Sequence, residues 1–210
     1  MHRIASFSDL KSTSANVALE RALHVDSEFC LIPVGEWVLQ DRYASVVESL
    51  VSWRRKNASS FFSPGDHSEA SMKSYLRDKS IADSSRILFL VAEQEGFRAV
   101  GHLGLSQAVP GYGAELDNVM RGVEDLKPDL MRQATLKLLG WAHENVPGRR
   151  FWLRVRGDNH RALRFYQSLG FTVAWMSRLD DQGKSGVSEV RMEIDVRSAN
   201  RSRGRNRPTI

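Results

Sequence analysis

The stretch Phe151–Phe171, FWLRVRGDNHRALRFYQSLGF, predicts a strand, a turn, a short helix and the start of another strand. Phe151, Leu153 and Val155 alternate with Trp152 and two arginines, which is the period of a β-strand, and Gly157 ends the alternation. Asp158 is a residue type that caps a helix N-terminus. Gly170 stands where a left-handed residue commonly ends a helix. Between them an apolar stripe recurs at helical spacing: Ala162, Phe165, Tyr166 and Leu169.

Six residues of this stretch match a known signature in order and in spacing. The chain resembles the GCN5-related N-acetyltransferase (GNAT) superfamily, whose C-terminal signature is V-x-x-x-N-x-x-A-x-x-x-Y-x-x-x-G-F. An ordinary βαβ packing unit explains the apolar stripe and the final Gly-Phe pair. It does not require Asn159 at the helix start or Tyr166 on the buried face. The matching residues are Val155, Asn159, Ala162, Tyr166, Gly170 and Phe171.

The remaining patterns predict an α/β (α+β) chain similar to the acyl-CoA N-acyltransferases, with a mixed central sheet of about seven strands flanked by helices. The long helix is expected to open at Pro128, a residue type favoured at the first helical position. The other predicted helices are Asp41–Lys56 and Ser68–Lys79. The predicted strands are Phe29–Val34, Ile87–Ala92, Ala99–Leu105, Glu115–Met120, Phe151–Val155, Phe171–Leu179 and Ser188–Val196. The resulting division is an N-terminal extension (1–28), a GNAT-like domain (29–196) and an Arg-rich tail (197–210).

The net charge of +5 is concentrated in the tail. Residues 197–210 hold five arginines and no acid, so residues 1–196 have a formal charge of zero. The tail has almost no apolar content, and its composition predicts disorder. A solvated tail is preferred to a nucleic-acid contact, because the body shows no basic patch in sequence. A nucleic-acid partner is therefore expected only through the tail.

Composition also bears on location and on metal binding. No apolar run approaches the roughly 20 residues needed to span a bilayer, and residues 1–14 lack the apolar segment of a signal peptide. The expectation is a cytoplasmic protein without a membrane partner. The single Cys30 lies in the apolar run FCLIPV, so core burial is expected rather than catalysis. No His/Cys/Asp cluster has metal-ligand spacing, so no metal is expected.

The resemblance implies acetyl-CoA as co-substrate, bound in a V between the strands at 115–120 and 151–155. The implied cofactor-binding residues are Asn118, Val119, Met120, Leu130, Met131, Arg132, Asn159 and Tyr166. The pyrophosphate would lie on the N-terminus of the long helix, where free N–H groups and the helix dipole favour anions.

The chain departs from the family pattern at this helix. The Q/R-x-x-G-x-G/A loop falls at 126–131, and none of its three anchor positions matches. Asp129 adds a negative charge, which Lys127 and Arg132 could offset. This departure leaves an alternative open: a non-catalytic GNAT-fold binding module.

For catalysis, the resemblance assigns Tyr166 as the general acid, and the alternative is a core tyrosine. Either Glu115 or Asp117, which share one strand face, could act as the base; the alternative is a pair of solvent-exposed acids. Asn159 would bind the pantetheine or fix the turn, or else only start the helix. His102 lies in an apolar strand, where a satisfied core histidine is favoured over a base.

The expected reaction is acetyl transfer to a primary amine of a small molecule, amino sugars included, or of a protein N-terminus. The segment VGHLGL (Val100–Leu105) and the pair Trp53-Arg54 also resemble members that act on these acceptors. Expected partners are the amine acceptor and, as an assembly to test, a second copy of the chain in a homodimer.

Overall fold

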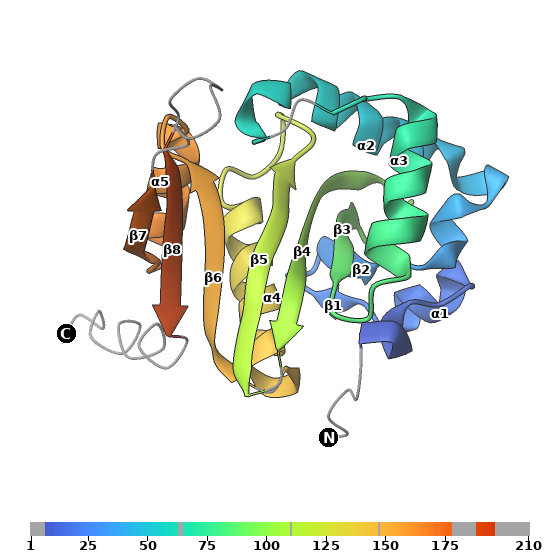
Figure 1. Cartoon of the computed structure of the whole chain (residues 1–210). Helices are drawn as coiled ribbons and strands as arrows, with labels where there is room; N and C mark the ends of the chain where they lie inside the picture. The colour runs from blue at the N-terminus through green and yellow to red at the C-terminus, as the bar shows by residue number, and fades with distance from the viewer. Residues whose placement is uncertain (1–6, 63–64, 110, 147, 178–187, 196–210) are drawn as a thin grey trace, which may run out of the picture.

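The computed structural model describes residues 7–62, 65–109, 111–146, 148–177 and 188–195 (Figure 1). The predicted tail at 197–210 lies outside the described residues. Within them the chain forms one mixed sheet with helices on both faces, so the predicted fold class is confirmed. The sheet has eight strands, one more than predicted.

The strand order in the sheet is β1-β2-β3-β4-β5-β6-β8-β7. Neighbours are antiparallel except for β5 and β6, which are parallel. The strands are β1 (Leu23–His24), β2 (Phe29–Pro33), β3 (Ile87–Glu93), β4 (Ala99–Val109), β5 (Tyr112–Arg121), β6 (Gly148–Arg156), β7 (Thr172–Ser177) and β8 (Glu189–Asp195).

The helices are α1 (Ala15–Glu20), α2 (Ala44–Lys56), α3 (Glu69–Tyr75), α4 (Leu130–Asn145) and α5 (His160–Ser168). Shorter helical turns are η1 (Phe7–Leu10), η2 (Glu36–Leu39), η3 (Asp41–Tyr43), η4 (Ala58–Ser60) and the π-helical η5 (Leu76–Ile81), which continues directly from α3.

Two predicted helix starts are wrong, and the reasons are local. Pro128 lies in the turn before α4, which begins at Leu130 after Asp129. Asp158 does not cap α5, because its carboxylate accepts hydrogen bonds from the Arg156 side chain. Asn159 caps the helix instead, its Oδ1 accepting from the amide of Ala162 at 3.0 Å. By contrast, Ser68 caps α3 as predicted, accepting from Ser71.

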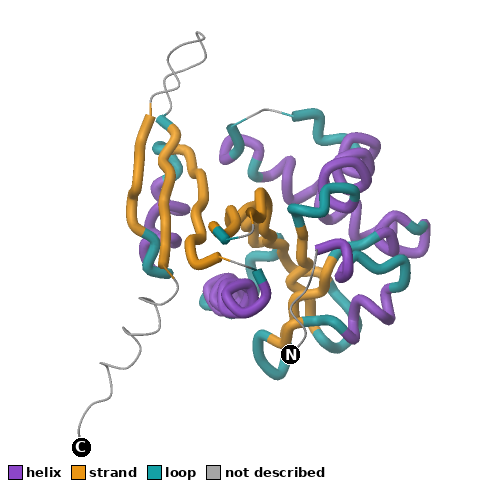
Figure 2. Tube along the Cα trace, turned by 60° about the horizontal axis from the view of Figure 1, so that its bottom comes forward, coloured by secondary structure: helices purple, strands orange, loops and turns teal. Residues whose placement is uncertain are grey.

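Both faces of the sheet are buried at β3 (Ile87–Glu93), which explains the near-continuous apolar run of this strand. Ile87, Phe89 and Val91 pack into a core with α4 and α5. The alternate residues Leu88, Leu90 and Ala92 pack on the opposite face with α1, α2 and α3 (Figures 1 and 2). Cys30 is buried in this second core, as expected for a small apolar side chain.

The N-terminal segment is part of the packed body. Strand β1 extends the sheet by pairing with β2, and α1 packs in the second core. Phe7 is only 5% exposed and packs against Trp141 of α4, with ring centroids 6.3 Å apart. Sequence periodicity did not reveal this segment, because its strand is two residues long.

The sheet opens between β5 and β6. Their parallel pairing runs from Tyr112–Gly148 to Glu115–Trp152, and beyond it β5 stays paired with β4 while β6 stays paired with β8. A bulge adds to this divergence, because two residues of β5 face one of β4 between His102 and Gly104. Asn118 lies in this bulge with a φ of 53°, a left-handed conformation that asparagine tolerates.

Candidate functional site

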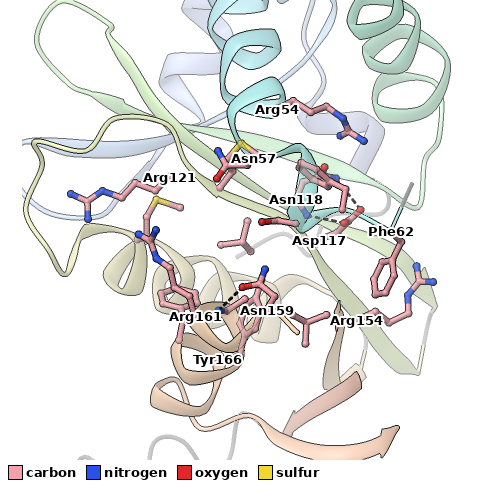
Figure 3. Close-up of a pocket in the computed structure, with 18 of the residues that line it drawn as sticks. Arg54, Asn57, Phe62, Asp117, Asn118, Arg121, Arg154, Asn159, Arg161 and Tyr166 are labelled. Carbon is pink, nitrogen blue, oxygen red and sulfur yellow. Dashed lines mark hydrogen bonds between the residues drawn. The ribbon is translucent and has the colours of Figure 1, made fainter. Parts of the chain in front are cut away.

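An open cavity of about 510 Å³ lies where β5 and β6 separate (Figure 3). Its walls come from these two strands, the end of α2 and the loop after it, the start of α4, and α5. Of the ten residues predicted for the site, seven line the cavity. They are Asp117, Asn118, Val119, Met120, Met131, Asn159 and Tyr166. Glu115, Leu130 and Arg132 do not.

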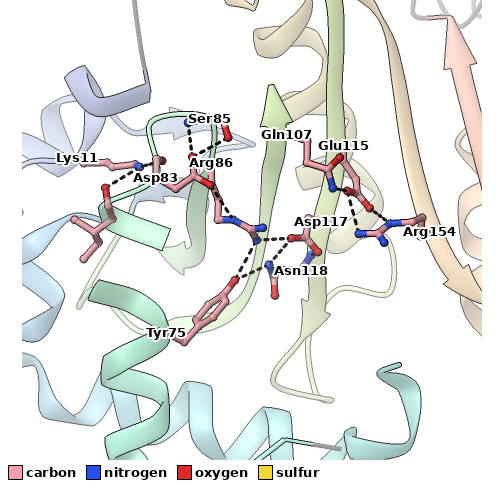
Figure 4. A network of polar contacts seen from close by, with 11 residues as sticks. Lys11, Tyr75, Asp83, Ser85, Arg86, Gln107, Glu115, Asp117, Asn118 and Arg154 are labelled. Atoms are coloured by element: carbon pink, nitrogen blue, oxygen red, sulfur yellow. Dashed lines mark hydrogen bonds and ion pairs between the residues drawn. The ribbon is translucent and has the colours of Figure 1, made fainter. Parts of the chain in front are cut away.

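Asp117 lies at the centre of a polar cluster with Tyr75, Arg86 and Asn118 (Figure 4). Its Oδ2 accepts from Arg86 Nη1 at 2.7 Å and from Asn118 Nδ2 at 2.9 Å, and its Oδ1 accepts from the Asn118 amide at 2.7 Å. A carboxylate offers about four acceptor positions, so one remains on Oδ1. Asp117 can therefore accept one further proton-bearing group from the cavity.

Tyr75 closes this cluster from α3. Its hydroxyl oxygen accepts from Asn118 Nδ2 at 2.9 Å, and Arg86 Nη1 lies 3.5 Å away. Burial and the Asp117 carboxylate raise the pKa of Tyr75, so its phenol stays protonated. Sequence reasoning placed Tyr75 on a buried helix face and did not single out Arg86, because neither residue belongs to a recognisable motif.

Glu115 is only 3% exposed, which overturns the alternative of two solvent-exposed acids on β5. Its carboxylate accepts from Arg154 Nε at 2.8 Å and from Gln107 Nε2 at 2.7 Å. The side chain takes no part in lining the cavity among the described residues. Its geometry is that of an anchor for Arg154, and Asp117 is the predicted base that the cavity exposes.

Tyr166 extends from α5 into the cavity wall and packs against Phe165 and Phe171, with ring centroids 5.3 and 6.0 Å away. Burial is the main cause that raises the pKa of Tyr166, and the Asp117 carboxylate adds to it. The phenol is therefore protonated at neutral pH and able to donate. Asn159 starts the same helix, and its Oδ1 is occupied by the cap while the residue also lines the cavity.

In the described part of the chain, the start of α4 has two free backbone donors, of which the one at Met131 lines the cavity and the one at Arg132 follows it in the same turn. The amides of Leu130 and Gln133 donate to Lys127 and Asp129 carbonyls, whereas the amides of Met131 and Arg132 have no hydrogen-bond partner among the described residues. Leu130 is buried in the core. Of the two residues expected to offset the charge of Asp129, Arg132 does so, with its Nη1 4.0 Å from Asp129 Oδ2, whereas Lys127 lies in other ion pairs. Lys127 pairs with Asp26 and Glu28, and Asp129 accepts a hydrogen bond from Gln133.

His102 is buried against Trp53, with ring centroids 6.1 Å apart. Burial lowers its pKa from 6.5 to about 4, while the Asn118 backbone and Asp117 partly oppose this shift and Arg54 adds to it. The ring is therefore neutral at physiological pH. It does not line the large cavity, which agrees with a histidine of the core. The expectation that the ring is satisfied is wrong for Nδ1, which has no hydrogen-bond partner among the described residues.

Among the residues that the structure describes, five arginines line the cavity against one carboxylate, Asp117. In Figure 3, Arg121 and Arg161 lie at one end, and Arg54 and Arg154 lie at the other with Phe62. Arg121 also donates to the carbonyls of Val123, Glu124 and Leu126 and so fixes the loop before α4. Arg54 belongs to the pair Trp53-Arg54 that the sequence analysis noted as part of a resemblance.

Comparison with solved structures decides the fold. A probable GNAT-family acetyltransferase from Chromobacterium violaceum matches with a TM-score of 0.67 and 19% identity, over 88% of each chain. The chain has the GNAT fold. A mutant form of the spermidine/spermine N-acetyltransferase SpeG from Vibrio cholerae matches this GNAT fold with a TM-score of 0.64 and 16% identity, over 84% of this chain and 99% of that one. The microcin C7 self-immunity acetyltransferase MccE, solved with acetyl-CoA and AMP, matches with a TM-score of 0.64 and 14% identity, over 81% and 94%.

No protein-family model matches the chain, and no curated protein matches it either. Within the described ranges, no group of three or more His, Cys, Asp or Glu side chains could hold a metal ion. None of the helices that the structure describes is long and apolar enough to cross a membrane.

Proposed function

We propose that the protein is an acetyl-CoA-dependent N-acetyltransferase acting on a primary amine. One observation carries the proposal: the cavity between β5 and β6 is lined both by a carboxylate, Asp117, and by a protonated phenol, Tyr166. These are the two groups that acyl transfer to an amine requires, a proton acceptor for the amine and a proton donor for the leaving group. They come from different elements, β5 and α5, and line one cavity where β5 and β6 separate.

The cavity residues fit acetyl-CoA despite the missing glycines. The free amides of Met131 and Arg132 at the start of a 16-residue helix would hold the pyrophosphate, helped by the helix dipole. Arg121 and Arg161 supply cationic side chains at the same end. Asp129 adds a negative charge to this loop, but its carboxylate accepts a hydrogen bond from Gln133 and does not line the cavity. Leu130 would contribute packing rather than a ligand contact.

When bound, acetyl-CoA supplies the acetyl group as an activated thioester. Oδ1 of Asp117 takes the proton of the acceptor amine directly or through water, since one acceptor position remains on it. The hydroxyl of Tyr166 donates its proton to the leaving sulfur. Backbone groups of β5 beside the bulge, at Asn118 to Met120, would orient the acetyl group. The acceptors of this proposal are small amines, amino sugars included, and N-terminal peptides.

Thermal unfolding with acetyl-CoA tests the proposal first. Acetyl-CoA at 100 times its dissociation constant should add about 2.7 kcal/mol to the free energy of unfolding. ATP, which lacks the pantetheine arm, is the control ligand and should stabilise much less. Release of free thiol is then measured over a panel of amino sugars, polyamines, amino acids and N-terminal peptides.

The outcomes separate the enzyme from the binding module. Thiol release with at least one amine supports the transferase. Tight acetyl-CoA binding without turnover over the whole panel supports a non-catalytic module. Absence of any stabilisation, together with no heat of binding by calorimetry, overturns both.

A further inference from the structure

Arg54 is held in the cavity wall by aromatic rings rather than by a carboxylate. Its guanidinium lies over the ring of Phe61 at 4.4 Å and over Tyr75 at 6.0 Å. Within the described residues, no hydrogen bond or ion pair to its side chain is found. Stacking of this kind orients the guanidinium while leaving its charge and N–H donors available. Arg54 is therefore preorganised to bind an anion.

Arg154 supplies a second set of donors at the same end of the cavity (Figure 3). Its Nε and Nη2 contact Glu115 at 2.8 and 3.4 Å, which leaves the Nη1 group free. The side chain is 47% exposed, and the Glu115 pairing fixes its orientation. Two guanidinium groups from separate elements, α2 and β6, thus present unpaired N–H donors to one region of the cavity.

This region lies across the cavity from the helix start that would hold the cofactor phosphates. Arg54 belongs to α2, whereas the proposed pyrophosphate site is formed by α4 with Arg121 and Arg161 nearby (Figure 3). Asp117, the proposed proton acceptor, lies on the side of the cavity that holds Arg54, Arg154 and Phe62. A molecule whose amine reaches Asp117 from this side would have its other end near Arg54 and Arg154.

We propose that the acceptor is a small primary amine that carries an anionic group, a phosphate or a carboxylate, bound by Arg54 and Arg154. This inference rests on the proposed acetyltransferase function and narrows its substrate class. A polycationic amine is disfavoured, because five arginines face the cavity against one carboxylate and like charges repel. Arg54 is a binding residue here, and it takes no part in proton transfer.

The experiment compares matched acceptors that differ only in the anionic group. Three pairs serve: glucosamine 6-phosphate with glucosamine, O-phosphoethanolamine with ethanolamine, and β-alanine with ethylamine. Spermidine is the cationic comparison. For at least one pair, kcat/KM of the anionic member should exceed that of its neutral partner about 10-fold or more, as expected for a charge-assisted hydrogen bond. The phosphate and carboxylate pairs distinguish the two sources of negative charge.

Arg54→Gln tests the assigned residue. It should lower kcat/KM for the preferred anionic acceptor by ~10- to ~100-fold, mainly through KM, and leave the acetyl-CoA dissociation constant unchanged. Arg54→Lys should restore part of the loss, since the charge is kept. Arg55→Gln is the matched control: Arg55 is the next residue of α2, is exposed, and does not line the cavity. This control should retain wild-type values.

The results that overturn the inference differ from those that overturn the function. The protein could bind acetyl-CoA and yet prefer neutral amines or spermidine, or show no preference in any pair. Either result refutes the anionic acceptor and leaves the proposed acetyl-CoA site unaffected. An Arg54→Gln variant that weakens acetyl-CoA instead of the acceptor assigns Arg54 to the cofactor and also refutes it. Failure to bind acetyl-CoA at all refutes the proposed function itself.

Discussion

Replacing His102 by Gln should remove a defined part of the acid sensitivity of the protein. The pKa of His102 is lowered by burial from 6.5 to about 4 in the folded state. As pH falls through about 6.5, the unfolded chain binds a proton at this residue while the folded protein does not until about pH 4. Because the unfolded state binds more protons in this window, the free energy of unfolding decreases as pH falls.

The magnitude follows from the two pKa values. Below both of them the full loss from this residue is about 3 kcal/mol, and near pH 5 it is about 2 kcal/mol relative to pH 7.5. Gln keeps a polar side chain of similar length and does not titrate, so the variant lacks this contribution. The difference between the wild-type and variant unfolding free energies should therefore shift by about 2 kcal/mol over this range.

Denaturant unfolding at a series of pH values between 5 and 7.5 gives this difference directly. Taking the difference cancels the carboxylates that also titrate at low pH. His160→Gln, at an exposed position on α5, is the control for the replacement of a histidine by glutamine. Parallel curves for His102→Gln and the wild type would show that His102 is not buried as a neutral ring, and the reasoning would fail.

Tyr166→Phe should lower kcat about 10²- to 10⁴-fold with little change in the acetyl-CoA dissociation constant, because it removes only the phenol proton; a folded variant with wild-type kcat, when chemistry limits the rate, excludes Tyr166 as the donor. Asp117→Asn should reduce kcat by a similar factor with little change in the acetyl-CoA dissociation constant; a folded variant with wild-type kcat would exclude Asp117 as the base. Phe7→Ala should cost about 3–5 kcal/mol of unfolding free energy, since the ring packs on α4. Leu19→Ala, at a position 39% exposed in the same N-terminal segment, should cost far less, and equal losses would contradict the burial of Phe7.

The fold was predictable because its decisive signals are local. The signature at 151–171 combines strand alternation, a helical stripe and Gly170, which indeed adopts a φ of 96°. The continuous burial of β3 likewise follows from its near-continuous apolar composition. The start of α5 was predicted one residue too early, because two neighbouring residue types can both serve as the helix cap. Asp158 and Asn159 can both cap a helix, and only the side chain of Arg156 decides between them.

The site was predictable only in part, because pairing across the sheet cannot be deduced from one strand. Glu115 and Asp117 have the same pattern in sequence, two acids on one strand face. Their environments differ because Arg154 and Gln107 enclose the first, while Arg86 and the bulge at Asn118 present the second to the cavity. The aromatic support of Arg54 depends on Phe61 and Tyr75, which belong to other segments and carry no motif.

The position of β8 between β6 and β7 has a consequence for how the sheet assembles. Strand β7 comes first in the chain, yet its only strand neighbour in the described structure is β8. Until β8 inserts, β6 has an unpaired edge and β7 has no partner. The pairing of both strands is therefore completed in the same late step. Unpaired edges of this kind promote intermolecular association. An interruption of the chain between β7 and β8 should therefore yield aggregation during refolding rather than a smaller stable sheet.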